Sequence, residues 1–147
     1  MDKAHFYDVT VTWDADRKGT MSSDSLPGRI EVATPPQFPQ GMVGIWSPEH
    51  LFIAAINSCL MTTFLAIAQN SKLQYKSFQS KAVGKLEIVA DKYIMSEVTL
   101  MPVLVIGNEA DKERAMRILQ KSEAACLISN SVKSKIILQP MIEVADE

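Results

Sequence analysis

The sequence predicts an α+β protein in which mostly antiparallel strands surround one long central helix, in the order βββ-α-ββ-α(α)-β. Two observations carry this prediction: runs of alternating apolar and polar residues over 7–13 and 80–90, and a mostly apolar stretch without a charged residue over 51–68. A period of two is typical of half-buried strands, whereas a long apolar run is typical of a buried helix. The length of 147 residues, with 47% hydrophobic and 22% charged side chains, fits one globular domain. We therefore expect a single domain over residues 1–147.

The first third of the chain predicts three strands. Residues 7–13 alternate Tyr, Val, Val and Trp with polar side chains, which is typical of a half-buried strand. A second strand should begin near Thr20. A third should cover residues 29–33, with Ile30 and Val32 facing inward.

The long helix has a clear start signal. A loop rich in Pro and Gly over residues 35–44 precedes Ser47, a good N-cap residue. Pro48 suits the first helical position, and Glu49 complements the positive end of the helix dipole. The helix should run to about Gln69 and is apolar on nearly every side. A sheet or a partner chain should therefore wrap it.

The apolar stretch is also of borderline length for a membrane span. It carries four polar side chains and is the one such stretch in the chain, so we interpret it as a core helix and expect no membrane partner. The N-terminus lacks the apolar core of a signal peptide, which predicts a cytoplasmic protein.

The second half predicts a hairpin, a helical region and a last strand. Alternating residues over 80–90 and 93–106 indicate an antiparallel hairpin. A charged amphipathic helix should run from Asn108 to Lys121, with Met116 and Leu119 on its inner face, and a shorter helical piece over residues 123–129 should hold Cys126. A final edge strand is expected over residues 136–144, because Pro140 cannot donate to a ladder.

Composition excludes several classes of function. The net charge of −2, without a block of like charges, disfavours a nucleic-acid partner. The two cysteines form no CxxC motif, and His5 and His50 lie far from both in sequence, so we expect no metal site and no cofactor.

The two cysteines are the candidates for chemistry. On a helix, Cys59 has mostly small neighbours one turn away, which could leave a pocket above the sulfur. Cysteine is also among the most buried residue types, so simple packing remains open for both Cys59 and Cys126. A redox pair would need their Cα atoms within about 7 Å, which spacing alone does not supply.

Three segments resemble the OsmC/Ohr family. The segment SPEHLFIAAINSC at 47–59 is similar to its signature, in which Pro-Glu opens a central helix that carries the reactive cysteine. AACLISNS at 124–131 resembles the second-cysteine segment, although Leu127 stands where the family often has Pro. DRKGTMSSD at 16–24 is similar to the turn that holds the functional arginine of the organic hydroperoxide resistance branch. The resemblance covers nearly the whole chain.

This resemblance implies a thiol peroxidase that protects against oxidative stress. Cys59 would attack an organic hydroperoxide and Cys126 would resolve the sulfenic acid as a disulfide. Arg17, or alternatively Arg29, would favour the Cys59 thiolate, and Glu49 would hold that guanidinium. A dithiol or lipoyl-type donor would act as the reductant.

The resemblance also implies an intertwined homodimer with two sites at the interface. Glu49 and Cys59 are about 15 Å apart along one helix, so the Arg–Glu pair must use the length of arginine or come from a second chain. We expect an apolar substrate lining of Phe52, Ile56 and Trp46, which suits an organic peroxide.

Two alternatives stay open at this point. A non-catalytic OsmC-like protein could bind an apolar ligand or partner in the same pocket, and Cys59 would then titrate as an ordinary thiol. A hot-dog thioesterase also has a long helix wrapped by a sheet, but it would need neither Cys126 nor the helical region at 108–129.

Overall fold

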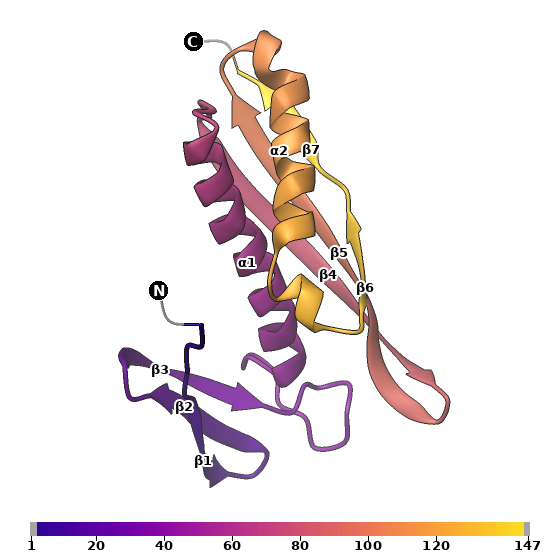
Figure 1. The fold of residues 1–147 in the computed structure, drawn as a ribbon. Helices are drawn as coiled ribbons and strands as arrows, with labels where there is room; N and C mark the ends of the chain where they lie inside the picture. The colour runs from indigo at the N-terminus through magenta and orange to yellow at the C-terminus, as the bar shows by residue number, and fades with distance from the viewer. Residues whose placement is uncertain (1–2, 146–147) are drawn as a thin grey trace. The chain divides into compact units, whose positions relative to one another are not determined.

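The computed structural model describes residues 3–145, and contacts within the chain divide it into two compact units that meet between Leu51 and Phe52. The first unit contains a three-stranded antiparallel sheet in the order β1-β2-β3 (Figure 1). Its strands are β1 (Thr10–Ala15), β2 (Lys18–Ser23) and β3 (Leu26–Ala33). The three predicted strands are therefore confirmed, although the first begins at Thr10 rather than at Tyr7.

The predicted burial of this sheet is wrong within one chain. Every residue of β1 is exposed, and Trp13 keeps 74% of its surface accessible. Ile30, predicted to face inward, is 46% exposed, and Val32 is half-buried. The described part of the first unit contributes no second layer to cover the sheet, so an alternating strand has nothing to bury its apolar side against.

Helix α1 (Pro48–Asn70) begins and ends as the sequence predicts. The Ser47 hydroxyl oxygen accepts a hydrogen bond from the His50 N–H at 3.1 Å, which satisfies one of the free donors of the first turn. Its length and its mean hydropathy of 2.0 over 18 residues would also allow a membrane span, and 28% of that window is buried.

Burial of α1 is confined to one face of the helix. That face is formed by Ile56, Cys59, Leu60, Phe64 and Ala68. The opposite face is exposed in the single chain, with Met61 at 39% and Leu65 at 38%. The sequence predicts a helix that is covered on every side, and this chain covers one side of it.

The second unit contains a long hairpin, β4 (Ser77–Val89) and β5 (Lys92–Ile106), as predicted. Ala90 and Asp91 form the turn with φ angles of 51° and 66°, the left-handed geometry that matches the twist of a tight hairpin. The pairing register shifts between Lys85 and Leu86. Beyond this bulge the hairpin leaves apolar side chains in solvent, and Ile88 is 60% exposed.

The single last strand predicted for residues 136–144 is in fact two strands. β6 (Lys135–Leu138) and β7 (Met141–Val144) both pair with β5 in parallel. Pro140 has no N–H to give to the ladder, so the pairing stops at Pro140 and resumes after it. β5 consequently lies between β4 on one side and β6 and β7 on the other, which confirms the edge position of the last segment.

The second helical region differs from the prediction. Asn108 accepts a hydrogen bond from Ala110 N–H at 3.0 Å and caps a short turn, η1 (Glu109–Asp111), which leads into α2 (Lys112–Ala125). α2 runs four residues past the predicted end, and residues 123–129 form no separate helix. Cys126 follows α2 in an extended conformation, and a short turn, η2 (Ser129–Ser131), comes after it.

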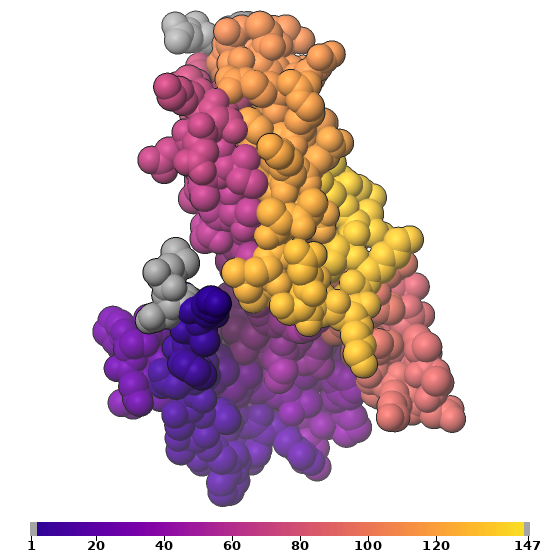
Figure 2. All heavy atoms as spheres, in the orientation of Figure 1, coloured from indigo at the N-terminus to yellow at the C-terminus, as the bar shows by residue number. Residues whose placement is uncertain are grey.

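Both helices pack on the same face of the second unit's sheet, and in Figure 2 α2 and the segment after it lie at the surface beside α1. Every second residue of β5 from Val98 to Ile106 is buried against them. Asn57 of α1 and Ser80 of β4 exchange two hydrogen bonds of 2.9 and 2.7 Å, which fix the helix along the strand. This arrangement brings the middle of α1 and the end of α2 over one sheet.

Candidate functional site: two thiols between α1 and the end of α2

The structure brings the two cysteines together. Cys59 lies on the buried face of α1 with 9% of its surface accessible, and Cys126 is completely buried. Both are free thiols, and the Cys126 thiol lies close enough to the Cys59 sulfur to lower the pKa of Cys59. The two thiols therefore lie near each other in the reduced protein.

Four hydrogen-bond donors surround the Cys59 sulfur. The Thr63 hydroxyl, one helical turn further along α1, lies 3.8 Å from it. The Cys126 thiol and the backbone N–H groups of Leu127 and Ile128 complete the set. Thr63 lies beside the sulfur because residues four apart share one face of a helix. The other three donors are present because the backbone leaves α2 at Cys126 in an extended conformation.

These donors lower the pKa of Cys59. Burial alone raises the pKa of the Cys59 thiol, but the hydrogen bonds from Cys126, Ile128, Thr63 and Leu127 outweigh it, and the pKa lies below that of a free cysteine. Each of these donors is electrically neutral. The site can therefore favour a thiolate by hydrogen bonding in a largely buried place.

Cys126 behaves in the opposite way. Burial raises the pKa of its thiol, and hydrogen bonding to Cys59 raises it further. In the reduced pair, Cys59 is thus the more acidic thiol, and Cys126 is the thiol that holds its proton more tightly. The arrangement suits one nucleophile and one protonated partner.

Arg17 and Glu49 belong to the first unit. Arg17 lies in the turn between β1 and β2, is exposed, and donates from Nε to the Gln40 side-chain oxygen at 3.0 Å. Glu49 is half-buried in the first turn of α1. Within residues 3–145 these two side chains form no ion pair with each other. Arg29, the alternative, is exposed on β3.

The three predicted lining residues lie in different surroundings. Ile56 is completely buried in a core cluster with Leu60, Val98 and Leu100, and Phe52 packs against that cluster. Trp46 precedes α1, is 55% exposed, and lines a hollow of about 350 Å³. Its ring lies edge-on to that of His50, with the ring centres 6.1 Å apart. Ile56 thus packs in the core, whereas Trp46 lies at a surface hollow.

Sequence reasoning missed the donors to Cys59. Thr63 could have been found from the i+4 spacing, because a hydroxyl there faces the same side of the helix as the sulfur. The N–H groups of Leu127 and Ile128 leave no signal in the side chains. Ser129, which lowers the pKa of Cys126, was also missed.

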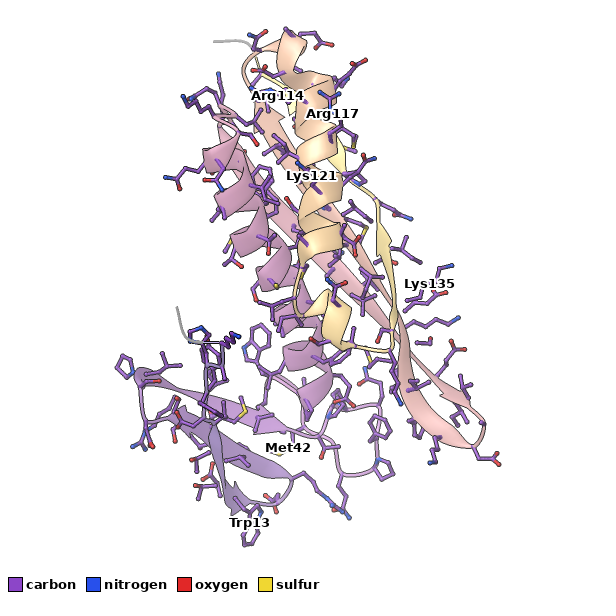
Figure 3. The ribbon with its side chains drawn as sticks, in the orientation of Figure 1. Trp13, Met42, Arg114, Arg117, Lys121 and Lys135 are labelled. Atoms are coloured by element: carbon purple, nitrogen blue, oxygen red, sulfur yellow. The ribbon has the colours of Figure 1, made fainter. Side chains whose placement is uncertain are left out.

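No group of three or more His, Cys, Asp or Glu side chains able to hold a metal ion occurs in the described range. The surface cations labelled in Figure 3 include Arg114, Arg117 and Lys121, which follow one another along α2. They line a separate hollow of about 550 Å³ on the helix surface.

Comparison with known proteins gives one consistent result. The family model described as OsmC-like protein matches residues 41–140. An uncharacterised protein of Bacillus subtilis, YmaD, is 23% identical over 92% of this chain and 91% of its own length. Among solved structures, an OsmC-like protein of unknown function from Vibrio cholerae has a TM-score of 0.83 at 23% identity, covering 94% of this chain and 100% of its own. An organic hydroperoxide resistance protein from Elizabethkingia anophelis has a TM-score of 0.77 at 20% identity, covering 99% and 100%. Because the family model matches well over half of the sequence, the chain belongs to the OsmC-like family.

Proposed function

We propose that this protein reduces organic hydroperoxides, with Cys59 as the attacking thiolate and Cys126 as the resolving thiol. The observation that carries the proposal is the proximity of two buried free thiols, where the pKa of Cys59 is lowered and that of Cys126 is raised. The fold similarity to a protein named for organic hydroperoxide resistance supports the same chemistry.

The first step is attack by the Cys59 thiolate on one oxygen of the hydroperoxide. An S–O bond forms, the O–O bond breaks, and the alkoxide leaves and takes up a proton to become the alcohol. The sulfur loses two electrons to the peroxide and becomes a sulfenic acid.

The second step is attack by Cys126 on the sulfenic sulfur of Cys59. An S–S bond forms, the S–O bond breaks, and the hydroxide leaves as water with the proton of Cys126. A dithiol or lipoyl-type reductant then returns both thiols by exchange and is itself oxidised to a disulfide.

The neutral donors give Cys59 part of its activation, and we propose that Arg17 and Glu49 add a charged contribution in a homodimer. An arginine stays protonated under all physiological conditions and can favour a nearby thiolate. The support for this assignment is the resemblance of residues 16–24 and 47–59 to the corresponding family segments.

Exposed apolar surface supports the homodimer. Tyr7 is 92% exposed, Trp13 74% and Val11 64%, all on the N-terminal segment. Met61 and Leu65 are also exposed on the open face of α1, and clustered exposed apolar side chains mark interaction surfaces. A second copy of the chain is the occupant that we propose for both surfaces.

The substrate preference follows from the surroundings of the sulfur. Ile56 and Leu60, which flank Cys59 on α1, belong to an apolar cluster against which Ile128 packs, and apolar surroundings favour an alkyl group over water. We expect an alkyl hydroperoxide to be reduced faster than hydrogen peroxide. Equal or faster turnover of hydrogen peroxide would contradict this preference.

The function is tested by peroxide consumption in the presence of a dithiol. The wild type should turn over an alkyl hydroperoxide repeatedly. Cys59→Ser should consume none. Cys126→Ser, assayed without the dithiol that would reduce its sulfenic acid directly, should consume about one equivalent and then stop. Full turnover by Cys59→Ser would overturn the assignment of the nucleophile.

A non-catalytic binding protein remains the competing function. It requires Cys59 to titrate as an ordinary thiol with a pKa near 8.5, whereas the donors around the sulfur favour a lower value. A pH titration of Cys59 reactivity therefore discriminates the two functions without any peroxide.

A further inference from the structure

Ser129 is a buried polar residue without a hydrogen-bonding role in the reduced protein. It is 7% exposed and lies in η2, three residues after Cys126. Its Oγ is the buried side-chain oxygen or nitrogen that has no hydrogen-bond partner among the described residues. A buried hydroxyl without a partner destabilises the folded protein, so its presence here calls for an explanation.

The backbone around η2 directs Ser129 toward Cys126. The Cys126 carbonyl accepts a hydrogen bond from Asn130 N–H at 3.0 Å, which closes the turn over the cysteine. Both the N–H and the hydroxyl of Ser129 lie where they favour a negative charge on the Cys126 sulfur. A protonated thiol is a weak acceptor, whereas a thiolate is a strong one, so the hydroxyl gains its partner only when Cys126 loses its proton.

We propose that Ser129 is a positioning residue for the resolving step, whose hydroxyl holds the Cys126 thiolate as it attacks the oxidised Cys59. This inference rests on the proposed function and deepens it. It assigns a role to a residue outside the Cys–Arg–Glu set.

The oxidation state of Cys59 decides when Ser129 acts. In the reduced pair, burial raises the pKa of Cys126, and the hydrogen bond and charge interaction with Cys59 raise it further. When the hydroperoxide has converted Cys59 into a neutral sulfenic acid, the two contributions from Cys59 disappear and the effect of burial remains. The donors from Ser129 remain, and they then favour loss of the Cys126 proton just when a nucleophile is needed.

Atoms and electrons balance in this step. The Cys126 thiol transfers its proton to the departing hydroxyl of the Cys59 sulfenic acid, which leaves as water. The Cys126 sulfur supplies the electron pair of the new S–S bond. Ser129 donates a hydrogen bond to the Cys126 sulfur as the proton leaves it, and Ser129 is itself unchanged.

The first experiment measures the pKa of Cys126 without any peroxide. In Cys59→Ser, Cys126 is the remaining cysteine, so the ultraviolet absorbance of its thiolate can be titrated against the variant lacking both cysteines. We expect Ser129→Ala to raise this pKa, with a loss of about tenfold in thiolate fraction at neutral pH. Ser131→Ala is the matched control: its hydroxyl lies in the same turn but donates to the Leu127 carbonyl at 2.7 Å, and it should leave the titration unchanged. An unchanged titration in Ser129→Ala would overturn the inference, whether or not the protein proves to be a peroxidase.

The second experiment follows disulfide formation after one equivalent of alkyl hydroperoxide. Ser129→Ala should form the sulfenic acid at the wild-type rate but close the disulfide about threefold more slowly at neutral pH, because greater nucleophilicity of the more basic thiolate offsets part of the tenfold loss. The deficit should vanish at high pH, where Cys126 is ionised in both proteins. A deficit that is constant across pH would indicate structural damage and contradict the positioning role. Absence of both the sulfenic acid and the disulfide in the wild type would instead refute the peroxidase proposal.

Discussion

At the residue scale, the feature that matters is a thiolate held by neutral donors. Sequence reasoning could pair Cys59 with Cys126 through the family resemblance, and the structure brings them into contact. It could not find the N–H groups of Leu127 and Ile128. Their direction depends on the extended backbone at Cys126, where a continuing helix was predicted.

A substitution of Thr63 tests directly whether these donors stabilise the Cys59 thiolate. Thr63→Val keeps the shape of the side chain but removes the hydroxyl 3.8 Å from the Cys59 sulfur. We expect the pKa of Cys59 to rise and the thiolate fraction at pH 7 to fall about fivefold, the worth of one ordinary hydrogen bond. The pH dependence of alkylation by a small thiol reagent measures it.

Thr62→Val is the control for this change. The Thr62 hydroxyl donates to the Cys59 carbonyl oxygen at 3.2 Å and does not contact the sulfur. Its alkylation profile should match the wild type. Equal profiles for both variants would show that the hydroxyl of Thr63 does not stabilise the thiolate.

At the scale of elements, sequence patterns predicted correctly those helices and hairpins that depend on neighbouring residues in the chain. The Ser47 cap, the helix it starts and the antiparallel hairpin were all predictable. The parallel pairing of β6 and β7 with β5 was not, because it depends on which edge of the hairpin the returning chain meets. The last strand is divided at Pro140 because proline has no N–H for the ladder.

Gly84 tests how closely α1 approaches β4. A Cβ added at this position would lie 2.5 Å from Ile53 Cδ1 and 2.8 Å from Ile53 Cγ1, closer than real contacts allow. We expect Gly84→Val to lower the free energy of unfolding by about 1–3 kcal/mol, as overpacking usually does. Urea denaturation measures this change. Gly28→Val is the control, since a Cβ on Gly28 meets no atom within 4 Å, and its cost should stay within about 0.5 kcal/mol.

At the scale of the whole molecule, the single chain leaves β1 and one side of α1 exposed. The failure of the predicted burial of β1 and of one side of α1 has one common physical reason: alternation and apolarity report that a surface is covered, but not by which chain. A homodimer would reconcile the sequence pattern with the exposed surface of the single chain.

Leu65 tests the homodimer. It is 38% exposed on the open face of α1, so Leu65→Lys would place a charge inside the proposed interface. We expect the wild type to sediment as a dimer and Leu65→Lys to shift toward the monomer by at least about tenfold in dissociation constant. Gln120→Lys adds the same charge to the exposed side of α2 and should leave the dimer intact. A monomeric wild type would contradict the account of both surfaces.

The central claim is that Cys59 and Cys126 act as one redox pair, and the most direct measurement is the product of a single oxidation. The reduced protein is treated with one equivalent of an alkyl hydroperoxide, and its free thiols and peptide masses are determined. The account predicts the loss of both thiols and a disulfide that links Cys59 to Cys126. Retention of both free thiols, or an oxidised Cys59 that never closes onto Cys126, would contradict it.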